Sequence, residues 1–141
     1  MPELDASFVD RGPNPGSVAI SLKSQADGNE GLVLTFGTAD RTCAKCGATD
    51  YPIGWSAGKI VNGEMASVYP ISCTGTWKCA LASASQKAYF GDTLECAANG
   101  EVKVAIIGSG SQILGKAMSE TDPGQYVIVM PISCCPTAAS S

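Results

Sequence analysis

The sequence predicts an all-β fold: a small sandwich or barrel built from two duplicated β units, with an extended N-terminal arm. Duplication is the first observation. YPISC at residues 69–73 returns as MPISC at residues 130–134, a shift of 134 − 73 = 61 residues. Carried back without a gap, this shift superposes identical residues at earlier positions: Val68 on Val129, Gly63 on Gly124, Gly54 on Gly115, Gly47 on Gly108 and Ala44 on Ala105. Residues 31–73 and 92–134 are therefore interpreted as two copies of one β unit.

The second observation is a series of short apolar runs separated by turn residues. Such turn signals at intervals of about 8–12 residues are typical of all-β sandwiches and barrels. Two copies are too few for a solenoid, which needs about three or more repeats to be stable. A duplicated barrel or sandwich is the fold that agrees with both observations.

The chain divides into an arm at residues 1–17, an all-β domain at 18–135 and a flexible tail at 136–141. Two prolines and two glycines within residues 12–16 exclude regular structure in the arm. The arm carries a few apolar side chains that would be sticky in water: Leu4, Phe8 and Val9. They would be accommodated on another subunit, and the alternative is a disordered terminus.

Short apolar runs predict the strands of each copy. In the first part of the chain, we expect strands at residues 17–23, 32–36 and 66–72, a start near 53, and loop at 37–52 around a short piece at 43–46. In the second copy, the expected strands are 93–97, 102–107, 113–118 and 126–132. Hairpin turns are expected at Asn62-Gly63 and Asn99-Gly100, and a turn at residues 122–124. The Ala- and Ser-rich segment 79–87 is predicted as a short helix.

Composition excludes several classes of function. The formal net charge is −4, which argues against nucleic acid as a partner. Histidine is absent, so the commonest general base and metal ligand is missing. No apolar run reaches the roughly 18 residues of a membrane span. The N-terminus lacks the regions of a secretory signal, so synthesis in a cytoplasm is expected. We expect neither a catalytic residue nor a cofactor.

Seven cysteines are many for this length, and an odd number cannot all pair within one molecule. Cys43 and Cys46 have the spacing of a zinc knuckle or redox pair, and Cys73 and Cys79 would complete a four-thiolate zinc site. Under the repeat shift, Cys43 falls on Val104 and Cys46 on Ile107, both apolar. Core-filling thiols are therefore favoured. A disulfide and a zinc site remain alternatives.

Three other features have unremarkable interpretations. Residues 108–111 (GSGS) lack the lysine and helix of a phosphate-binding loop and are expected to form a turn. The scattered carboxylates of Asp92, Glu120 and Asp122 indicate a solvated face or a weak Ca²⁺ site. Two tryptophans are expected in the core rather than at an interface: Trp55 and Trp77.

Four segments of the second copy follow each other in a recognisable order. They are GDTLE at 91–95, NGEVKVA at 99–105, ILGKAM at 113–118 and PGQYVIV at 123–129. This part of the chain resembles the capsid cement, or decoration, proteins of tailed bacteriophages in the DUF2190-like group. The first copy departs from that pattern, because Trp55, Ser56 and Ala57 follow Gly54 where the second copy has Lys-Ala-Met.

The resemblance implies a virion structural protein and not an enzyme. Such a protein is made in the host cytoplasm and binds the outer capsid surface at junctions between major capsid protein subunits, where it stabilises the shell. It implies a homo-oligomer, with a trimer favoured over a dimer. The arm would lie along the shell and contact it through Leu4, Phe8, Val9 and Arg11. The competing hypothesis is a small zinc-binding adaptor module that uses Cys43, Cys46, Cys73 and Cys79.

Overall fold

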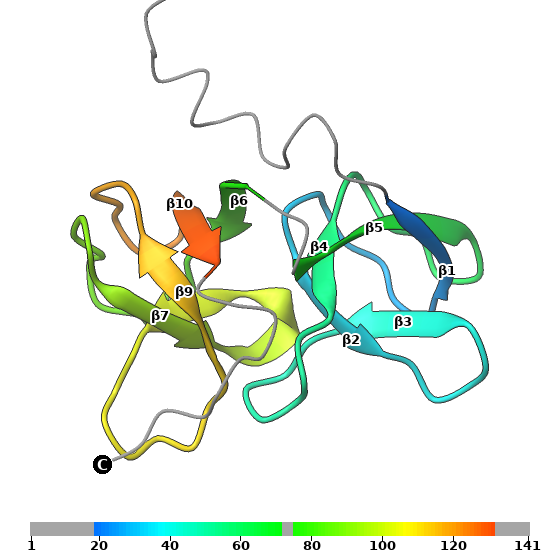
Figure 1. The fold of residues 1–141 in the computed structure, drawn as a ribbon, viewed down its shortest axis with the longest axis horizontal. Helices are drawn as coiled ribbons and strands as arrows, with labels where there is room; N and C mark the ends of the chain where they lie inside the picture. Colours follow the sequence, from blue (N-terminus) through cyan, green and yellow to red (C-terminus); the bar gives the residue numbers. More distant parts are fainter. Residues whose placement is uncertain (1–18, 72–74, 132–141) are drawn as a thin grey trace, which may run out of the picture.

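The computed structural model describes residues 19–71 and 75–131, and the all-β prediction is confirmed there (Figure 1). Five strands belong to the first half of the chain: β1 (Ile20–Ser24), β2 (Val33–Phe36), β3 (Thr42–Lys45), β4 (Gly54–Ser56) and β5 (Met65–Pro70). Five belong to the second half: β6 (Trp77–Ala80), β7 (Thr93–Cys96), β8 (Val102–Val104), β9 (Ile113–Ala117) and β10 (Tyr126–Pro131). The predicted helix at 79–87 is wrong, because its start lies in β6, which pairs with β10.

The two halves have the same strand order. The first sheet is a closed barrel in the order β1-β3-β2-β4-β5, closed by the antiparallel pairing of β5 with β1. The second sheet has the order β6-β10-β9-β7-β8, which is the same arrangement with β6 in the place of β1. A single parallel bridge between Leu81 and Val102 joins its ends, where the first barrel has the parallel pair β1–β3, and we call this nearly closed sheet the second barrel. The duplication read from the sequence is therefore a duplication of topology.

The repeat shift of 61 residues holds for the last two strands of each copy. Gly54 pairs with Pro70, and Gly115 pairs with Pro131 in the same register. At both glycines, a Cβ atom would lie 2.2 Å from the carbonyl oxygen of the residue before that proline. Both copies therefore need glycine at this crossing for the same steric reason.

The shift does not hold without gaps for the earlier strands. Gly54 faces Leu34, whereas Gly115 faces Leu94, so β2 and β7 are related by 60 residues. A β-bulge between Leu94 and Glu95 accounts for the difference. Along the adjoining pairs, Cys43 faces Phe36 and Val102 faces Cys96. The alignments of Cys43 with Val104 and of Cys46 with Ile107 were therefore wrong, and Cys43 takes the place of Val102.

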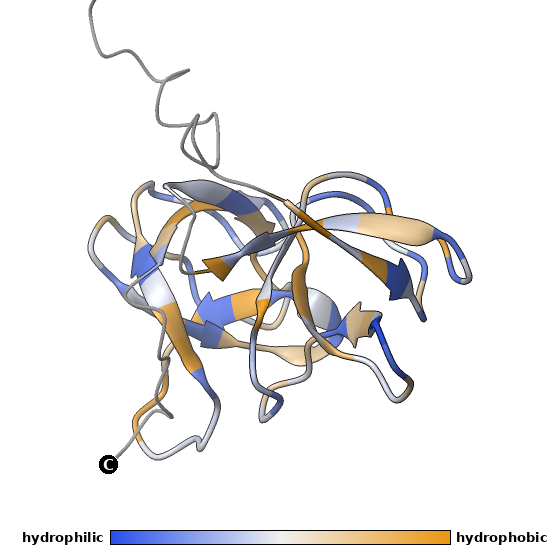
Figure 2. Ribbon diagram, turned by 45° about the vertical axis from the view of Figure 1, so that its right-hand side comes forward, coloured by the Kyte–Doolittle hydropathy of each residue, from blue (hydrophilic) through white to orange (hydrophobic). Residues whose placement is uncertain are grey.

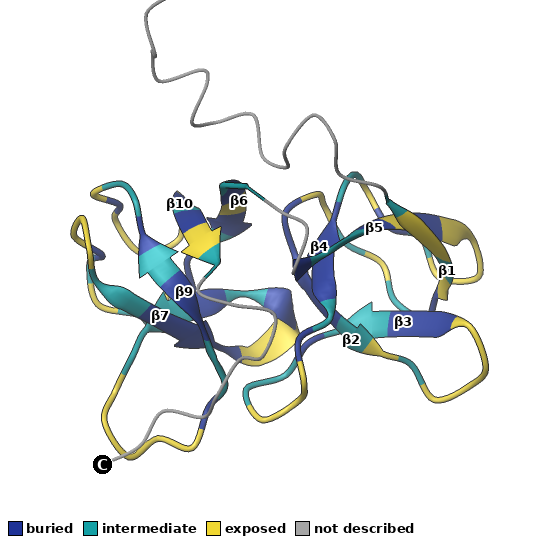
Figure 3. Ribbon diagram, viewed as in Figure 1, coloured by how far each residue is buried: buried dark blue, intermediate teal, exposed yellow. Residues whose placement is uncertain are grey.

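Two clusters of buried side chains form the core. The smaller one fills the first barrel and includes Leu34, Cys43 and Val68. The larger one fills the second barrel and continues across the contact between the barrels. The ribbons coloured by hydropathy and by burial show apolar and buried positions on the strands of both barrels (Figures 2 and 3). Trp55 and Trp77 stack there with ring centroids 6.1 Å apart, and both are buried, as predicted. The larger cluster is thus shared by the two barrels, and the smaller one belongs to the first barrel alone.

The predicted turns are present. Asn99 and Gly100 both have positive φ, 59° and 76°, as a tight hairpin requires, and they connect β7 to β8. Gly63 and Gly124 have φ of 88° and 85° at equivalent turns before β5 and β10. Among the residues that the structure describes, no helix is long and apolar enough to cross a membrane.

Candidate functional site

Several residues predicted to form sites lie outside the described residues. These are the arm residues and one cysteine: Leu4, Phe8, Val9, Arg11 and Cys73. The arm at 1–17, the tail at 136–141 and the capsid-binding role of the arm therefore stay predictions.

The described cysteines are buried thiols that do not gather into one site. Cys43 belongs to the core of the first barrel, while Cys46 belongs to the core shared by both barrels. Cys79 is in the shared core as well, with its Sγ 3.6 Å from the carbonyl oxygen of Gly100. Within residues 19–71 and 75–131, no three potential ligands are placed to hold a metal ion. The Cys-x-x-Cys spacing is thus occupied by two thiols that pack in different cores.

The contact between the barrels uses different faces of the two copies. The first copy contributes the end of β3 and the loop after it: the carbonyl oxygens of Cys46 and Ala48 accept hydrogen bonds from the N–H groups of Gly100 (2.8 Å) and Gln112 (3.0 Å). At the other side of the contact, the Tyr126 hydroxyl donates to the Glu30 carbonyl oxygen at 3.2 Å. The barrels are therefore joined head to tail.

In a head-to-tail contact, each barrel buries one face and leaves exposed the face that is equivalent to the one its neighbour buries. On the first barrel, the strand positions that correspond to Trp77, Cys96 and Tyr126 are occupied by Ile20, Phe36 and Met65. These three side chains are 44%, 67% and 65% exposed, respectively. We call them the first outer face.

The second barrel presents the complementary face. Met130 corresponds to Tyr69, which packs against Trp77 in the contact between the barrels, and it is exposed. The loop after β8 corresponds to the loop after β3 and carries two exposed isoleucines at its start, Ile106 and Ile107. We call Ile106, Ile107 and Met130 the second outer face.

The loop of the second outer face is held by a buried carboxylate that was not predicted. Glu95 is fully buried, and its Oε1 accepts hydrogen bonds from the Ile106 N–H (3.1 Å) and the Ser109 hydroxyl (2.9 Å). Its Oε2 lies 3.4 Å from the ammonium group of Lys103. Glu95 therefore holds the start of this loop in place. The predicted strand 102–107 ends early, at Val104, so Ile106 and Ile107 belong to the loop.

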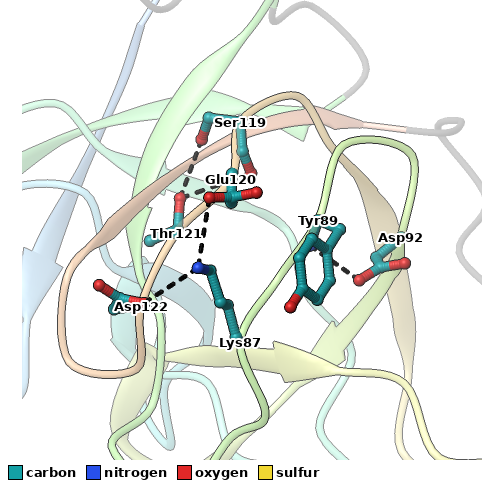
Figure 4. Close-up of polar contacts among 7 residues, drawn as sticks. All are labelled: Lys87, Tyr89, Asp92, Ser119, Glu120, Thr121 and Asp122. Carbon is teal, nitrogen blue, oxygen red and sulfur yellow. Dashed lines mark hydrogen bonds and ion pairs between the residues drawn. The ribbon is translucent and has the colours of Figure 1, made fainter.

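A polar cluster occupies the surface of the second barrel (Figure 4). The Lys87 ammonium lies 3.2 Å from Glu120 and 3.7 Å from Asp122, and the Asp92 carboxylate accepts the Tyr89 N–H at 2.8 Å. A neighbouring hollow of about 450 Å³ is lined by Lys78, Ser119, Glu120, Thr121, Asp122, Gln125, Tyr126 and Ile128. The three carboxylates that the sequence left as a solvated face or a Ca²⁺ site are thus engaged by a lysine and a backbone amide.

The two-barrel fold is similar to one found in a bacteriophage. A solved structure of the N base of head fiber gp8.5 from bacteriophage phi29 matches with a TM-score of 0.65 and 16% sequence identity. The match covers 82% of this chain and 93% of that chain. At this identity the likeness establishes the fold. No protein family matches the sequence, so the DUF2190-like family is not shown. No curated protein matches it either.

Proposed function

We propose that this protein is a structural component of a bacteriophage head that binds the outer capsid surface and decorates it. The observation that carries the proposal is the fold: 82% of this chain is similar in structure to 93% of the N base of a phage head fiber. The pattern of residues 91–129, which resembles capsid decoration proteins, favours the same kind of particle. In the finer form of the proposal, the chain stabilises the shell at junctions between major capsid protein subunits and has no catalytic activity.

The outer faces support self-association. The exposed outer face of each barrel is equivalent in position to the face that the other barrel buries in the contact within the chain. We expect the second outer face of one chain to pack on the first outer face of another, because equivalent positions of the two copies pack on each other within the chain. Repetition of such a heterologous contact closes into a ring when the rotation allows. A homotrimer is the proposed ring.

Light scattering after size-exclusion chromatography tests the self-association. Phe36→Asp changes the first outer face and Met130→Asp changes the second, and either should reduce the wild-type oligomer to a monomer. Asn62→Asp adds the same charge at the tip of an exposed turn, and it should leave the oligomer intact. A monomeric wild-type chain, or an oligomer that survives both face variants, would contradict the proposed ring.

Binding to the particle is tested by co-sedimentation with expanded phage heads that lack the protein. The full-length chain should bind saturably, and a chain that begins at Ser17 should bind more weakly because it lacks residues 1–16 of the arm. Many identical weak contacts add through multivalency, so loss of one contact per subunit should lower the apparent affinity steeply. Circular dichroism must show that the shortened chain is folded. Failure of both forms to bind would reject the proposed function.

A further inference from the structure

Two thiols face each other in the contact between the barrels. Cys46 follows β3 in the first barrel, and Cys96 ends β7 in the second. Their Sγ atoms are 4.0 Å apart, and both side chains are fully buried. The Cys46 N–H donates to the Val33 carbonyl oxygen at 2.9 Å, and the Cys96 N–H donates to that of Gln112 at 2.8 Å. The backbone of each barrel therefore fixes one member of the pair.

The other two described thiols are placed differently. Cys43 lies in the separate core of the first barrel. Cys79 lies in the shared core, and its thiol is directed at the Gly100 carbonyl oxygen. A disulfide has an S–S bond of about 2.05 Å, so the Cys46 and Cys96 sulfurs must approach by about 2 Å to form one. Because backbone hydrogen bonds hold both cysteines, rotation of the two side chains about their Cα–Cβ bonds has to supply this approach.

We propose that Cys46 and Cys96 form a latent disulfide that joins the two barrels covalently when the protein meets an oxidant. The oxidant is a small-molecule disulfide such as glutathione disulfide. One cysteine thiolate attacks it, forms a mixed disulfide and releases the first glutathione thiolate. The second cysteine thiolate then displaces the other glutathione. Two electrons pass from the cysteines to glutathione disulfide, and the two thiol protons end on two molecules of glutathione.

The surroundings make the exchange slow in the closed molecule. The hydrogen bond to Cys96, followed by burial, raises the pKa of the Cys46 thiol well above its ordinary value, so little thiolate is present near neutral pH. Full burial also keeps the oxidant out. Reaction therefore proceeds through local opening of the contact between the barrels. The pair stays reduced in a cytoplasm and is converted after the protein leaves it. This inference does not depend on binding to a phage head.

The test oxidises the full-length reduced protein with glutathione disulfide, in urea below the unfolding transition so that the contact opens. Remaining thiols are then alkylated, and peptides are mapped without reduction. We expect a linked peptide that joins Cys46 to Cys96, two hydrogens lighter than the reduced pair. Cys43→Ser should retain this link, and Cys96→Ser should lose it. The oxidised wild type should melt several degrees higher than the reduced form, and dithiothreitol should abolish the increase.

One result would overturn the inference even if the Cys96→Ser chain fails to fold. If oxidised wild-type protein carries other cysteine pairs while Cys46 and Cys96 are both recovered alkylated after unfolding, the latent disulfide does not exist. Mapping of the wild-type chain alone gives this answer, since it needs no variant. A linked pair without any rise in melting temperature would contradict the covalent joining of the barrels.

Discussion

At the scale of single residues, one buried carboxylate organises the apolar loop of the second barrel. Glu95 accepts two hydrogen bonds from that loop and faces Lys103. A charged side chain in a strand is ordinarily expected to face solvent, the more so because its neighbours Leu94 and Cys96 are buried. Sequence reasoning missed Glu95 because the loop that covers it comes from residues more than ten positions later. No pattern in the residues next to Glu95 predicts that this loop buries its side chain.

Replacing Glu95 with alanine should destabilise the protein by about 1–3 kcal/mol, since a partly buried loop amide and a hydroxyl lose their acceptor. Urea unfolding measures the change in the free energy of unfolding. Glu64→Ala, at an exposed position, is the matched control and should change stability little. Equal effects of the two substitutions would show that the carboxylate does not anchor the loop.

The buried thiols predict a loss of stability in alkali. Burial raises the pKa of the Cys79 thiol above its ordinary value of 9.0. Above pH 9 the unfolded chain releases this proton and the folded chain keeps it, so the free energy of unfolding falls as pH rises, by at most about 1.4 kcal/mol per pH unit for one thiol. Cys79→Ala should be less stable at pH 7.5 but lose less stability between pH 7.5 and 10. Parallel urea midpoints across that range would contradict this explanation.

At the scale of elements, the crossing of a glycine over an X-Pro segment is the best preserved part of the duplication. In both copies the glycine faces the proline of the last strand, and a Cβ atom would collide with backbone. The sequence could predict this, because both partners sit in the segment where the repeat shift needs no gap. The sequence could not predict the one-residue change of register in the earlier strands, since the residues at the bulge have no distinctive composition.

Gly54→Ala and Gly115→Ala should each destabilise the protein by about 1–3 kcal/mol, because backbone must move to admit the methyl group. Gly58→Ala is the control: a Cβ there meets nothing within 4 Å, and its φ is not positive. Thermal unfolding of the three variants checks the prediction. The account would be wrong if Gly58→Ala cost as much as the other two.

Strand prediction succeeded where turn chemistry and apolar runs coincided and failed for β6. The hairpin at Asn99-Gly100 correctly predicted β7 and β8 as neighbours. The residues of β6 precede an Ala- and Ser-rich stretch that favours helix locally. Pairing with β10, a strand almost fifty residues away, decides its conformation instead.

At the scale of the whole molecule, the two barrels should unfold as one unit, since Trp55 and Trp77 stack in a core that both share. Tryptophan fluorescence and far-ultraviolet circular dichroism should report the same urea midpoint. Trp77→Ala should cost about 3–5 kcal/mol and keep a single transition. Two separated transitions in the wild-type protein would show that the barrels are independent.

The candidate site was less predictable than the fold. The sequence pointed to the arm, to the Cys-x-x-Cys pair and to scattered carboxylates, whereas the structure points to two outer faces and a Cys46–Cys96 pair. Exposure of Phe36 and Met130 depends on which barrel face the other copy covers. The exposure of these two side chains follows from how the two copies pack on each other, and a repeat in the sequence does not specify this packing.

The central claim is that this chain decorates the outside of a phage head. Electron cryomicroscopy of heads assembled with and without the protein tests it most directly. The account predicts added density at symmetry-related positions on the outer surface, with each subunit fitted by two adjacent barrels. Heads that look identical in the two preparations, or added density only inside the shell, would contradict it.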